Sequence, residues 1–484
     1  MDKTGKTPLI KALVKHKNLS TAPFHMPGHK KGKGVSRGFA QLMKTDPFSL
    51  DMTEVPGLDD LHSPYGPIQE AQNIAASLFG ADQTFFLVNG TSVGIHAAIM
   101  SVCRQNDIIV LPRDIHRSVI GACILSGARP EYLPARIAEE FCIPLPPKKQ
   151  DIEAALTKHQ KAKAIFQVYP SYYGIAGNLK EIADLAHFHR IPLIVDEAHG
   201  AHLSFSARVP IPALKQGADI SVQSTHKTLG ALTQASMLHV NSSIIDGAEV
   251  FRHLKVLQST SPSYLLMASL DSVTGHMSTN GKTLMEKTID LAEYVRHEIM
   301  FIPGLKCLDE TVIQGDEGFT IDPTKIYISV VGIGLTGYQA AEILLKKYKI
   351  QVELSDKYSV LCMLSLGNTA NDAKSLVRAL NEMASVKRRP IKLEHRFNFG
   401  FTPLLVLTPR QAWFASKKRI ALRESVGQVA AEIIAPYPPG IPLICPGEEI
   451  TREIVEIILL LQAQSCSFQG PEDRSLETVN VIDG

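Results

Sequence analysis

The sequence predicts an α/β protein with a larger domain built on a mostly parallel sheet and a smaller C-terminal α+β domain. Three observations support this prediction. The chain of 484 residues is long for a single hydrophobic core. From residue 68 onward, short and almost continuously apolar segments alternate with segments of helical periodicity, as in sheets covered by helices on both faces. Several polar motifs follow such apolar segments directly, where sheets of this kind bind ligands.

The N-terminal part, residues 1–67, is predicted to be an amphipathic helix followed by irregular loops. Two segments rich in proline and glycine break regular structure, PFHMPGHKKGKG at 23–34 and EVPGLDDLHSPYGPI at 54–68. The second carries the adjacent acids Asp59 and Asp60. Long irregular segments in a compact protein often serve function, although the first segment is equally consistent with an exposed basic connector.

Residues 68–303 are predicted to form the larger domain. Helical segments such as IQEAQNIAASLFG and LKEIADLAHFH separate its strands, as the crossovers between parallel strands require. A long helical region at 263–301 ends the domain. The predicted strands are TFFLV (84–88), IIVL (108–111), AIFQVY (164–169), PLIVD (192–196), ISVQ (220–223) and SMLHV (236–240).

Residues 304–484 are predicted to form the smaller domain, which begins at the irregular segment FIPGLKCLDE. Its strands include YISVVG and SVLCMLSLG. Two helical patterns follow, NDAKSLVRALNEM and PRQAWFASKKRIALRES. A segment rich in proline and glycine, PYPPGIPLICPGE at 436–448, precedes the last helix.

The composition is that of an ordinary soluble globular protein, with 45% hydrophobic and 20% charged residues. Fifty basic residues balance 48 acidic ones, so no net field attracts nucleic acid or an anionic membrane. The seven cysteines are scattered and never spaced C-x-x-C, which argues against a disulfide framework or a zinc site. The N-terminus has no apolar core of a signal peptide. A cytoplasmic location is expected.

Two residues at the ends of predicted strands indicate pyridoxal phosphate (PLP) chemistry. Asp196 ends the strand PLIVD, and Lys227 lies in the small-residue turn STHK after the next strand. PLP enzymes need a lysine that forms an imine with the cofactor aldehyde and a carboxylate that keeps the pyridine nitrogen protonated. We therefore interpret Lys227 as the Schiff-base lysine and Asp196 as the partner of the pyridinium.

The same motifs have two other interpretations. The run DEAHGAH at 196–202 contains two carboxylates and two histidines, but it lacks H-E-x-x-H and follows a strand, so we expect no metal. A purely structural role for Asp196, as a cap of the next element, is the more serious alternative. The lysine at the end of a second apolar strand argues against it, because most lysines lie on solvated surfaces.

Further motifs at strand ends complete the predicted site. Thr91 and Ser92 open a helix after the strand TFFLV, where free backbone N–H groups favour a phosphate, although hydroxyl residues here are mostly simple caps. His116 follows the strand IIVL and could stack on a ring or be structural. The hydroxyl of Ser224, beside Lys227, is a further phosphate donor.

With these residues in place, the chain resembles the Orn/Lys/Arg decarboxylases of the aspartate-aminotransferase-like PLP enzymes of fold type I. It is most similar to the short bacterial arginine/lysine decarboxylases. The resemblance covers nearly the whole chain through the motifs PFHMPGHKKG, LDDLHSP, NGTS, PRDIHRS, VDEAHGAH, STHKTLGALTQAS, STSPSYLLMASLD and PYPPGIPLICPGE.

The resemblance implies roles for individual residues. Lys227 binds PLP covalently, Asp196 pairs with the ring nitrogen, and His116 stacks on the ring. His226 and His199 lie next to the cofactor, and His226 or Lys227 returns a proton to the product. The resemblance further implies that the phosphate is held by Thr91, Ser92 and Ser224 and, from a partner subunit, by Thr260 and Ser261.

The resemblance also implies an assembly. Members with large double rings carry an N-terminal domain similar to a response regulator, whereas here the PFHMPGHK motif begins at residue 23. A homodimer or a dimer of dimers with shared active sites is therefore expected.

The expected reaction is decarboxylation of a basic L-amino acid in polyamine biosynthesis. Arginine, giving agmatine, is favoured, with lysine (cadaverine) or ornithine (putrescine) as alternatives. Another PLP reaction, such as aminotransfer or C–S lysis, and a non-catalytic regulatory relative are the rival hypotheses. The substrate's distal cation needs an acidic or carbonyl-rich partner, for which the candidates are Asp59, Asp60, Glu448 and the PYPPGIP loop.

Overall fold

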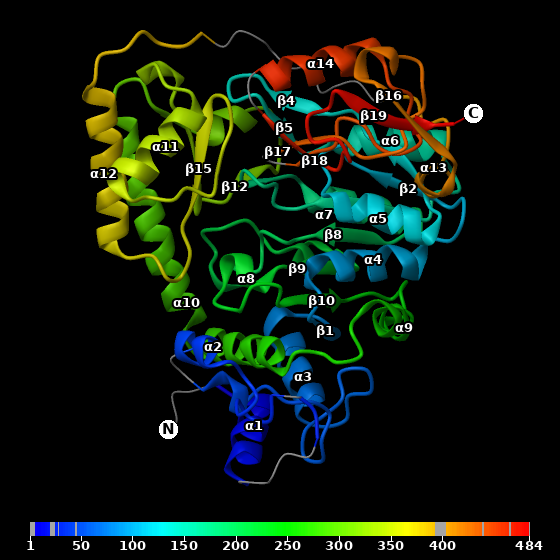
Figure 1. The fold of residues 1–484 in the computed structure, drawn as a ribbon, viewed down its shortest axis with the longest axis vertical. Helices are drawn as coiled ribbons and strands as arrows, with labels where there is room; N and C mark the ends of the chain where they lie inside the picture. Colours follow the sequence, from blue (N-terminus) through cyan, green and yellow to red (C-terminus); the bar gives the residue numbers. More distant parts are fainter. Residues whose placement is uncertain are drawn as a thin grey trace.

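The computed structural model describes residues 5–19, 25–27, 29–43, 46–392, 403–437, 440–463 and 466–483. Its centre is a seven-stranded sheet with the strand order β1-β10-β9-β8-β6-β2-β3 (Figure 1). The five strands from β9 to β3 are parallel, and β10 runs antiparallel to both β9 and β1. This confirms the predicted mostly parallel sheet. The strands are β1 Gln83–Leu87, β2 Ile108–Leu111, β3 Arg129–Tyr132, β6 Ala164–Val168, β8 Leu193–Asp196, β9 Ile220–Gln223 and β10 Ser236–Val240.

Helices cover both faces of this sheet, because successive side chains of a strand point to opposite faces. In β2, Val110 belongs to one apolar cluster, whereas Ile109 and Leu111 belong to the other. The first cluster is covered by α3 Pro67–Phe79, α6 Lys149–Lys158, α7 Leu179–Phe188 and α10 Tyr264–Met300. The second is covered by α4 Gly90–Val102, α5 Arg117–Ser126 and α9 Gly247–Leu257.

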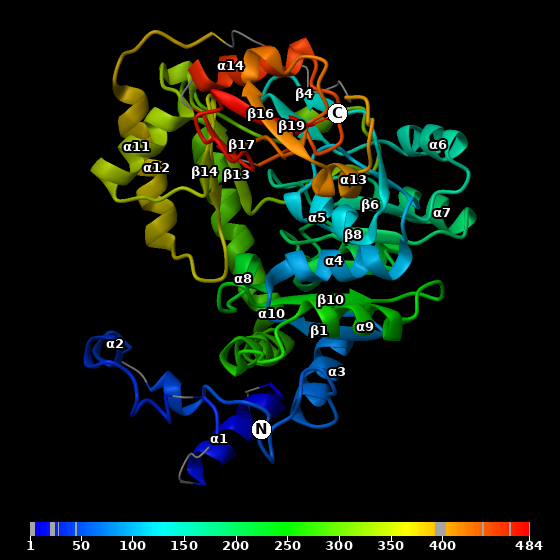
Figure 2. The same cartoon turned by 45° about the vertical axis from the view of Figure 1, so that its right-hand side comes forward.

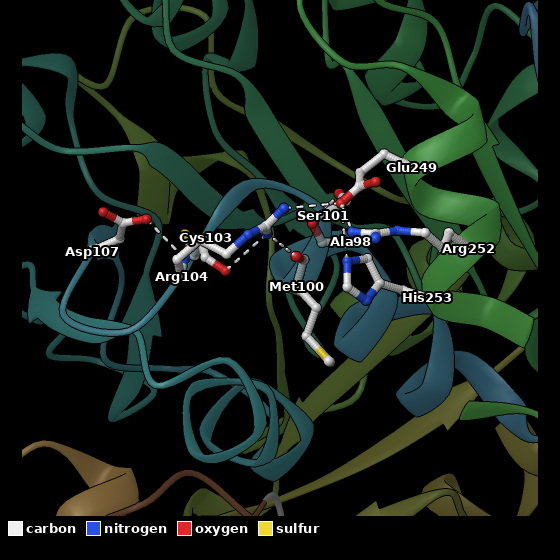
Figure 3. Close-up of polar contacts among 9 residues, drawn as sticks. All are labelled: Ala98, Met100, Ser101, Cys103, Arg104, Asp107, Glu249, Arg252 and His253. Atoms are coloured by element: carbon white, nitrogen blue, oxygen red, sulfur yellow. Dashed lines mark hydrogen bonds and ion pairs between the residues drawn. The ribbon is translucent and has the colours of Figure 1, made fainter. Parts of the chain in front are cut away.

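Polar contacts link the end of α4 to α9 on the second face (Figure 3). Arg104 Nη2 lies 2.9 Å from Glu249 Oε1, and the backbone N–H of Arg104 donates to Asp107 Oδ2 at 2.7 Å. Arg252 donates to the same oxygen of Glu249 at 2.6 Å. Exposed ion pairs of this kind contribute little free energy, so the apolar contacts beneath them hold α9 in place.

The N-terminal segment lies below the sheet in both views and carries α1 Pro8–Asn18 and α2 Arg37–Leu42 (Figures 1 and 2). The helix α1 buries Leu9 and Leu13 in the first apolar cluster and packs on α3 and α10. The amphipathic helix predicted for the first 20 residues is thereby found, with Pro8 at its first turn, where a missing N–H costs nothing.

Beyond α10 the chain forms a second sheet of four antiparallel strands in the order β11-β13-β15-β14. With two following helices and the end of α10 it encloses its own apolar cluster. These elements are β11 Lys306–Cys307, β13 Lys325–Ser329, α11 Gly337–Tyr348, β14 Leu354–Ser355, β15 Ser359–Met363 and α12 Ala370–Ser385.

The last part of the chain has a further apolar cluster, so residues 304–484 contain two cores. Its elements are α13 Pro409–Phe414, β16 Lys417–Ala421, β17 Ala435–Tyr437, α14 Arg452–Ala463, β18 Ser467–Gln469 and β19 Thr478–Ile482. The helix predicted for PRQAWFASKKRIALRES is wrong beyond Phe414. Its second half is the strand β16, because pairing with β19 overrides a weak helical preference.

Short elements connect these units. These are the hairpin of β4 Arg136–Ala138 and β5 Ile143–Leu145 and the pair of β7 Ile175–Ala176 with β12 Thr320–Ile321. Residues of β4, β5 and β7 share an apolar cluster with residues of the second sheet. The four-residue helix α8 Thr225–Thr228 follows β9 directly. No helix of the parts that the structure describes has the length and apolar character needed to cross a bilayer.

Candidate active site

A cavity of about 360 Å³ opens beyond the carboxyl ends of β6, β8 and β9. Asp196 is the last residue of β8, and Ser224 is the first residue after β9, so both reach the cavity wall. The cavity brings together eight of the residues predicted for the site, namely Thr91, Ser92, His116, Asp196, His199, Ser224, His226 and Lys227. Its volume fits a small organic ligand.

Lys227 and Asp196 both line this cavity, and the charge of each acts on the pKa of the other. Burial lowers the pKa of Lys227, and the charge of Asp196 opposes that shift. Burial likewise raises the pKa of Asp196, against the charge of Lys227 and a 3.0 Å hydrogen bond from the backbone N–H of Ala198. Burial thus shifts the pKa of each group toward its neutral form, and the charge of the other group opposes that shift.

Hydroxyl groups gather where α4 begins. Thr91 Oγ1 hydrogen-bonds to Ser224 Oγ and lies 3.1 Å from Ser236 Oγ. Gly90, the first residue of α4, has φ of 76°, a conformation that side chains disfavour. Free N–H groups at a helix start, together with hydroxyls, form a donor set suited to a phosphate.

Two histidines of the cavity have defined tautomers. His116 caps α5, and its Nδ1 accepts from the N–H of Ser118 at 3.2 Å, so Nε2 carries the proton of the neutral ring. Burial, aided by the charge of Lys227, lowers the pKa of His116 to about 4. His226 donates from Nδ1 to the carbonyl of Ala235 at 2.9 Å, and burial lowers its pKa.

The residues of the DEAHGAH run point in different directions. Glu197 accepts three hydrogen bonds beneath the sheet end, from Ala213 N at 2.8 Å, Ser221 Oγ at 2.5 Å and Gln223 Nε2 at 2.8 Å. His202 Nε2 lies 3.0 Å from Asp322 Oδ2. Of the run, Asp196, Ala198 and His199 line the cavity.

Two of the acids predicted to bind the substrate's distal cation lie elsewhere. Asp59 is buried and accepts backbone hydrogen bonds at 2.8–3.2 Å from Asp60, Tyr65, Gly66, Ile68 and Gln69, so it caps the start of α3. Glu448 is buried and paired by both oxygens with Arg113. Neither carboxylate lines the cavity of this subunit, and both are bonded to structural partners.

The remaining predicted residues lie outside the cavity of this subunit. Asp60 Oδ1 accepts from the N–H of His62 at 2.8 Å, and Thr260 and Ser261 are exposed. Of the PYPPGIP loop, Gly440 and Ile441 line the cavity, whereas Pro438 and Pro439 lie outside the described residues. Residues 23, 24 and 28 of the PFHMPGHKKGKG segment also lie outside them.

Two residues of the site were missed from the sequence. Asp114 lines the cavity, is partly buried, and has its pKa raised to about 7 by burial. Within the described part of the chain no other side chain pairs with its carboxylate. Lys325, on β13 of the second sheet, contacts His199. The sequence offered a signal only for Asp114, an acid two residues before His116 in the PRDIHRS motif.

The fold is that of the PLP enzymes of fold type I. The constitutive lysine decarboxylase of Escherichia coli superimposes with a TM-score of 0.84 over 99% of this chain and 82% of its own, at 21% identity. An alanine–glyoxylate aminotransferase from Nostoc superimposes with a TM-score of 0.54, over 76% of this chain and 98% of its own, at 16% identity. At these identities the likeness defines the fold class.

Within that class, the chain belongs to the Orn/Lys/Arg decarboxylase family. The family model of the major domain matches residues 7–372, and that of the C-terminal domain matches residues 394–474. An arginine decarboxylase of Bacillus anthracis is 40% identical over 479 residues, which cover 99% of this chain and 97% of that protein. The predicted family is thereby confirmed, and the chain is a PLP-dependent decarboxylase.

The residues present fit this cofactor. The cavity combines a lysine of lowered pKa, a buried carboxylate and a cluster of hydroxyls at a helix start. These are the three groups that a PLP site requires for its aldehyde, ring nitrogen and phosphate. Lys227 would bind the aldehyde, and Asp196 would bind the ring nitrogen. The phosphate would be bound by Thr91, Ser92 and Ser224.

Proposed function

We propose that this protein decarboxylates L-arginine, giving agmatine and CO2, in polyamine biosynthesis. The observation that carries the proposal is the meeting of Lys227 and Asp196 in one cavity at the sheet edge. Support for arginine comes from the full-length similarity to proteins named arginine decarboxylase. Lysine and ornithine are the alternative substrates.

When bound, PLP supplies an electron sink for the charge left on the substrate as CO2 departs. The chain's own residues prepare for that step. Asp196 would keep the ring nitrogen protonated, and His116, whose pKa burial lowers to about 4, would lie beside the ring as a neutral imidazole. After CO2 has left, Lys227 or His226 returns a proton to the product, since both line the cavity.

The cavity also offers an acid for a basic substrate. Asp114 and Asp196 are the two carboxylates among the residues found to line the cavity, and no cation of the described residues pairs with Asp114. We assign it to the distal guanidinium or ammonium in place of Asp59 and Glu448. A carboxylate accepts two parallel hydrogen bonds from a guanidinium, which favours arginine.

The test compares the wild-type enzyme with Lys227→Ala, offering each arginine, lysine and ornithine. The wild-type protein should bind PLP with visible absorbance and release CO2 fastest from arginine, and Lys227→Ala should do neither. The exposed Lys346→Met serves as the matched control and should keep full activity. Wild-type turnover by Lys227→Ala would refute the assignment. Transamination products would favour a rival PLP reaction, and bound cofactor without CO2 release a regulatory relative.

We further propose a cytoplasmic homodimer or dimer of dimers whose active sites are shared between subunits. Thr260 and Ser261 are exposed on this subunit, as expected for residues that complete a partner's phosphate site. The mostly buried cysteines form no disulfide among the described residues, which is consistent with a reducing compartment.

A further inference from the structure

The charges of this chain cancel over its whole length but not along it. Residues 1–45 contain nine lysines and one arginine against one aspartate. Residues 46–70 contain six acidic residues and neither lysine nor arginine. We call these two segments the basic block and the acidic block. A charge asymmetry of this size between neighbouring segments indicates a partner that is recognised by its charge.

Ion pairs within one subunit join the two blocks at two points among the described residues. Lys17 Nζ lies 3.3 Å from Asp46 Oδ2, and His29 Nε2 lies 3.2 Å from Asp51 Oδ2. The side chains of Lys17 and Asp46 are both exposed, so this pair contributes little free energy. The blocks therefore neutralise each other in part.

Exposed charges of both blocks remain without an ion-pair partner in the part of the chain that the structure describes. Lys33 and Arg37 of the basic block are exposed, as are Glu54 and Glu70 of the acidic block. Glu54 accepts a hydrogen bond from the hydroxyl of Thr53, which brings no positive charge. Each block thus presents uncompensated charge, and the two blocks are of opposite sign.

The helix α2, in the basic block, has no buried residue. Figure 2 shows it standing clear of the central sheet and of the helices that cover that sheet. The ring of Phe39 packs on Phe48 of the same segment, with centroids 5.7 Å apart, but Phe39 is still 46% exposed and Leu42 is 74% exposed. A helix of six residues is too short to be stable in water by itself, since even favourable sequences need about 12 residues. A surface that covers α2 would stabilise it.

The acidic block lies beside the residues that are proposed to reach a partner subunit. His62 Nε2 lies 2.8 Å from the carbonyl oxygen of Ser259, and Tyr264 OH donates to the carbonyl of Asp59. These two contacts flank residues 260–261. The acidic block is therefore continuous with the face at which a second copy of the chain is expected.

A second copy of this chain matches both blocks. In a dimer with two-fold symmetry the same patch occurs on both subunits, so a basic and an acidic block side by side are self-complementary. Each basic block then faces the acidic block of the other subunit. A nucleic acid or an anionic membrane would be attracted by the basic block but repelled by the acidic block beside it. The pairing of opposite blocks favours self-association.

We propose that α2, with Lys33 before it, docks on the face of a second copy that carries Glu54 and Glu70, and that Leu42 is buried at this contact. The inference rests on the proposed self-association of the protein and names the surface that carries it. Because salt screens exposed charges, the association weakens as the ionic strength rises.

The test reverses the charges of each side separately in the full-length protein. One variant carries Lys33→Glu and Arg37→Glu, and the other carries Glu54→Lys and Glu70→Lys. Each variant alone should raise the dissociation constant of the homodimer about tenfold or more at low ionic strength, because every contact then joins like charges. An equal mixture of the two variants should form heterodimers of wild-type affinity, since both contacts of the mixed dimer again join opposite charges. Energy transfer between differently labelled subunits, followed on dilution, measures each constant.

Two further variants separate docking from folding. Lys374→Glu with Arg378→Glu reverses one lysine and one arginine that are exposed on α12, and it should leave the dissociation constant unchanged. Leu42→Ser should weaken association while keeping the wild-type melting temperature, because Leu42 is largely exposed in a single subunit. Thermal melting of every variant checks that it is folded.

Three results would overturn the proposal. One is an association of the Lys33→Glu, Arg37→Glu variant as tight as that of the wild type, and another is a mixture of the two charge variants without heterodimers. The third is a wild-type protein that stays monomeric at low ionic strength and binds vesicles of anionic phospholipid through Lys33 and Arg37.

These outcomes are separable from those of the proposed function, because no measurement uses an amino-acid substrate. A protein that forms the charge-swapped heterodimers but releases no CO2 from any basic amino acid would keep the inference and refute the decarboxylation. A dimer that both charge variants leave unchanged would refute this surface and keep the proposed homodimer.

Discussion

Desolvation is the main influence on the charged residues of this site. Burial comes first among the causes that shift the pKa values of Asp196, Lys227, His116 and Asp114. Each of these groups is pushed toward its neutral form. Perturbed groups of opposite tendency in one cavity are typical of active sites, where a proton must be moved near neutral pH. Asp114 differs from the others because no side chain in the described ranges of the chain pairs with it.

Replacing Asp114 tests whether it receives the substrate's cation. Asp114→Asn should lower kcat/KM for arginine by tenfold or more, because a hydrogen bond between charged groups contributes about 1.5–3 kcal/mol. With a pKa of about 7, the wild-type carboxyl becomes protonated below that pH and loses its attraction for the cation. The gap between wild type and variant should therefore shrink as the pH falls below 7.

Steady-state kinetics across this pH range would provide the measurement. Asp60→Asn is the matched control, because Asp60, although itself one of the acids predicted for the distal cation, lies outside the cavity of this subunit. It should leave kcat/KM unchanged. An unchanged KM in Asp114→Asn would remove Asp114 from the substrate site.

At the scale of elements, a single carboxylate organises the entry to α3. Asp59→Ala would leave five backbone N–H groups without their acceptor. We expect local opening of α3 to become easier by about 2 kcal/mol, which is about a 30-fold faster amide exchange over residues 66–79. Hydrogen–deuterium exchange measures this. Asp60→Ala, which removes the acceptor of one N–H, should have a smaller effect, and equal exchange in both variants would contradict the capping role.

Most elements of the larger domain could be predicted, because buried strands show as short apolar runs. The boundaries of β2, β9 and β10 coincide with the predicted ones. The strand β16 could not be predicted, since its exposed KKRIA sequence becomes a strand only by pairing with β19. Local pattern carries no information on such a distant partner.

The residues of the site likewise include some that the sequence predicts and some that it does not. Asp196 and Lys227 were found because each follows an apolar strand, and parallel topology brings their ends together. No local sequence pattern marks Lys325, because only its contact with His199, 126 positions away, links it to the site. The partners of Asp59 and Glu448 could not be predicted, because an acidic residue in a loop looks the same whether it binds a ligand or, as in this subunit, a helix start or Arg113.

At the scale of the whole molecule, the C-terminal part takes part in the site wall. The Arg113–Glu448 pair is buried, and Arg113 also donates to the carbonyl of Leu443 at 2.8 Å. Arg113 immediately precedes Asp114, so the C-terminal part fixes the loop between β2 and α5 that carries the proposed substrate ligand and His116. A buried ion pair of this kind is costly to break, which makes it a rigid tie between distant segments.

The proposed sharing of active sites between subunits gives the last prediction. Lys227→Ala and the double variant Thr260→Ala, Ser261→Ala should each be impaired as homodimers. In a mixed dimer, both lesions fall in one site and the other site is intact, so the doubly purified mixed dimer should recover about one half of the wild-type kcat. Co-expression with two affinity tags and assay of the doubly purified dimer provides the measurement.

Lys227→Ala mixed with Asp196→Asn is the control. Both residues line the same subunit's cavity, so each site of the mixed dimer carries one lesion and no activity should be recovered. Recovery in the control, or none in the first mixture, would show that Thr260 and Ser261 do not reach across to a partner.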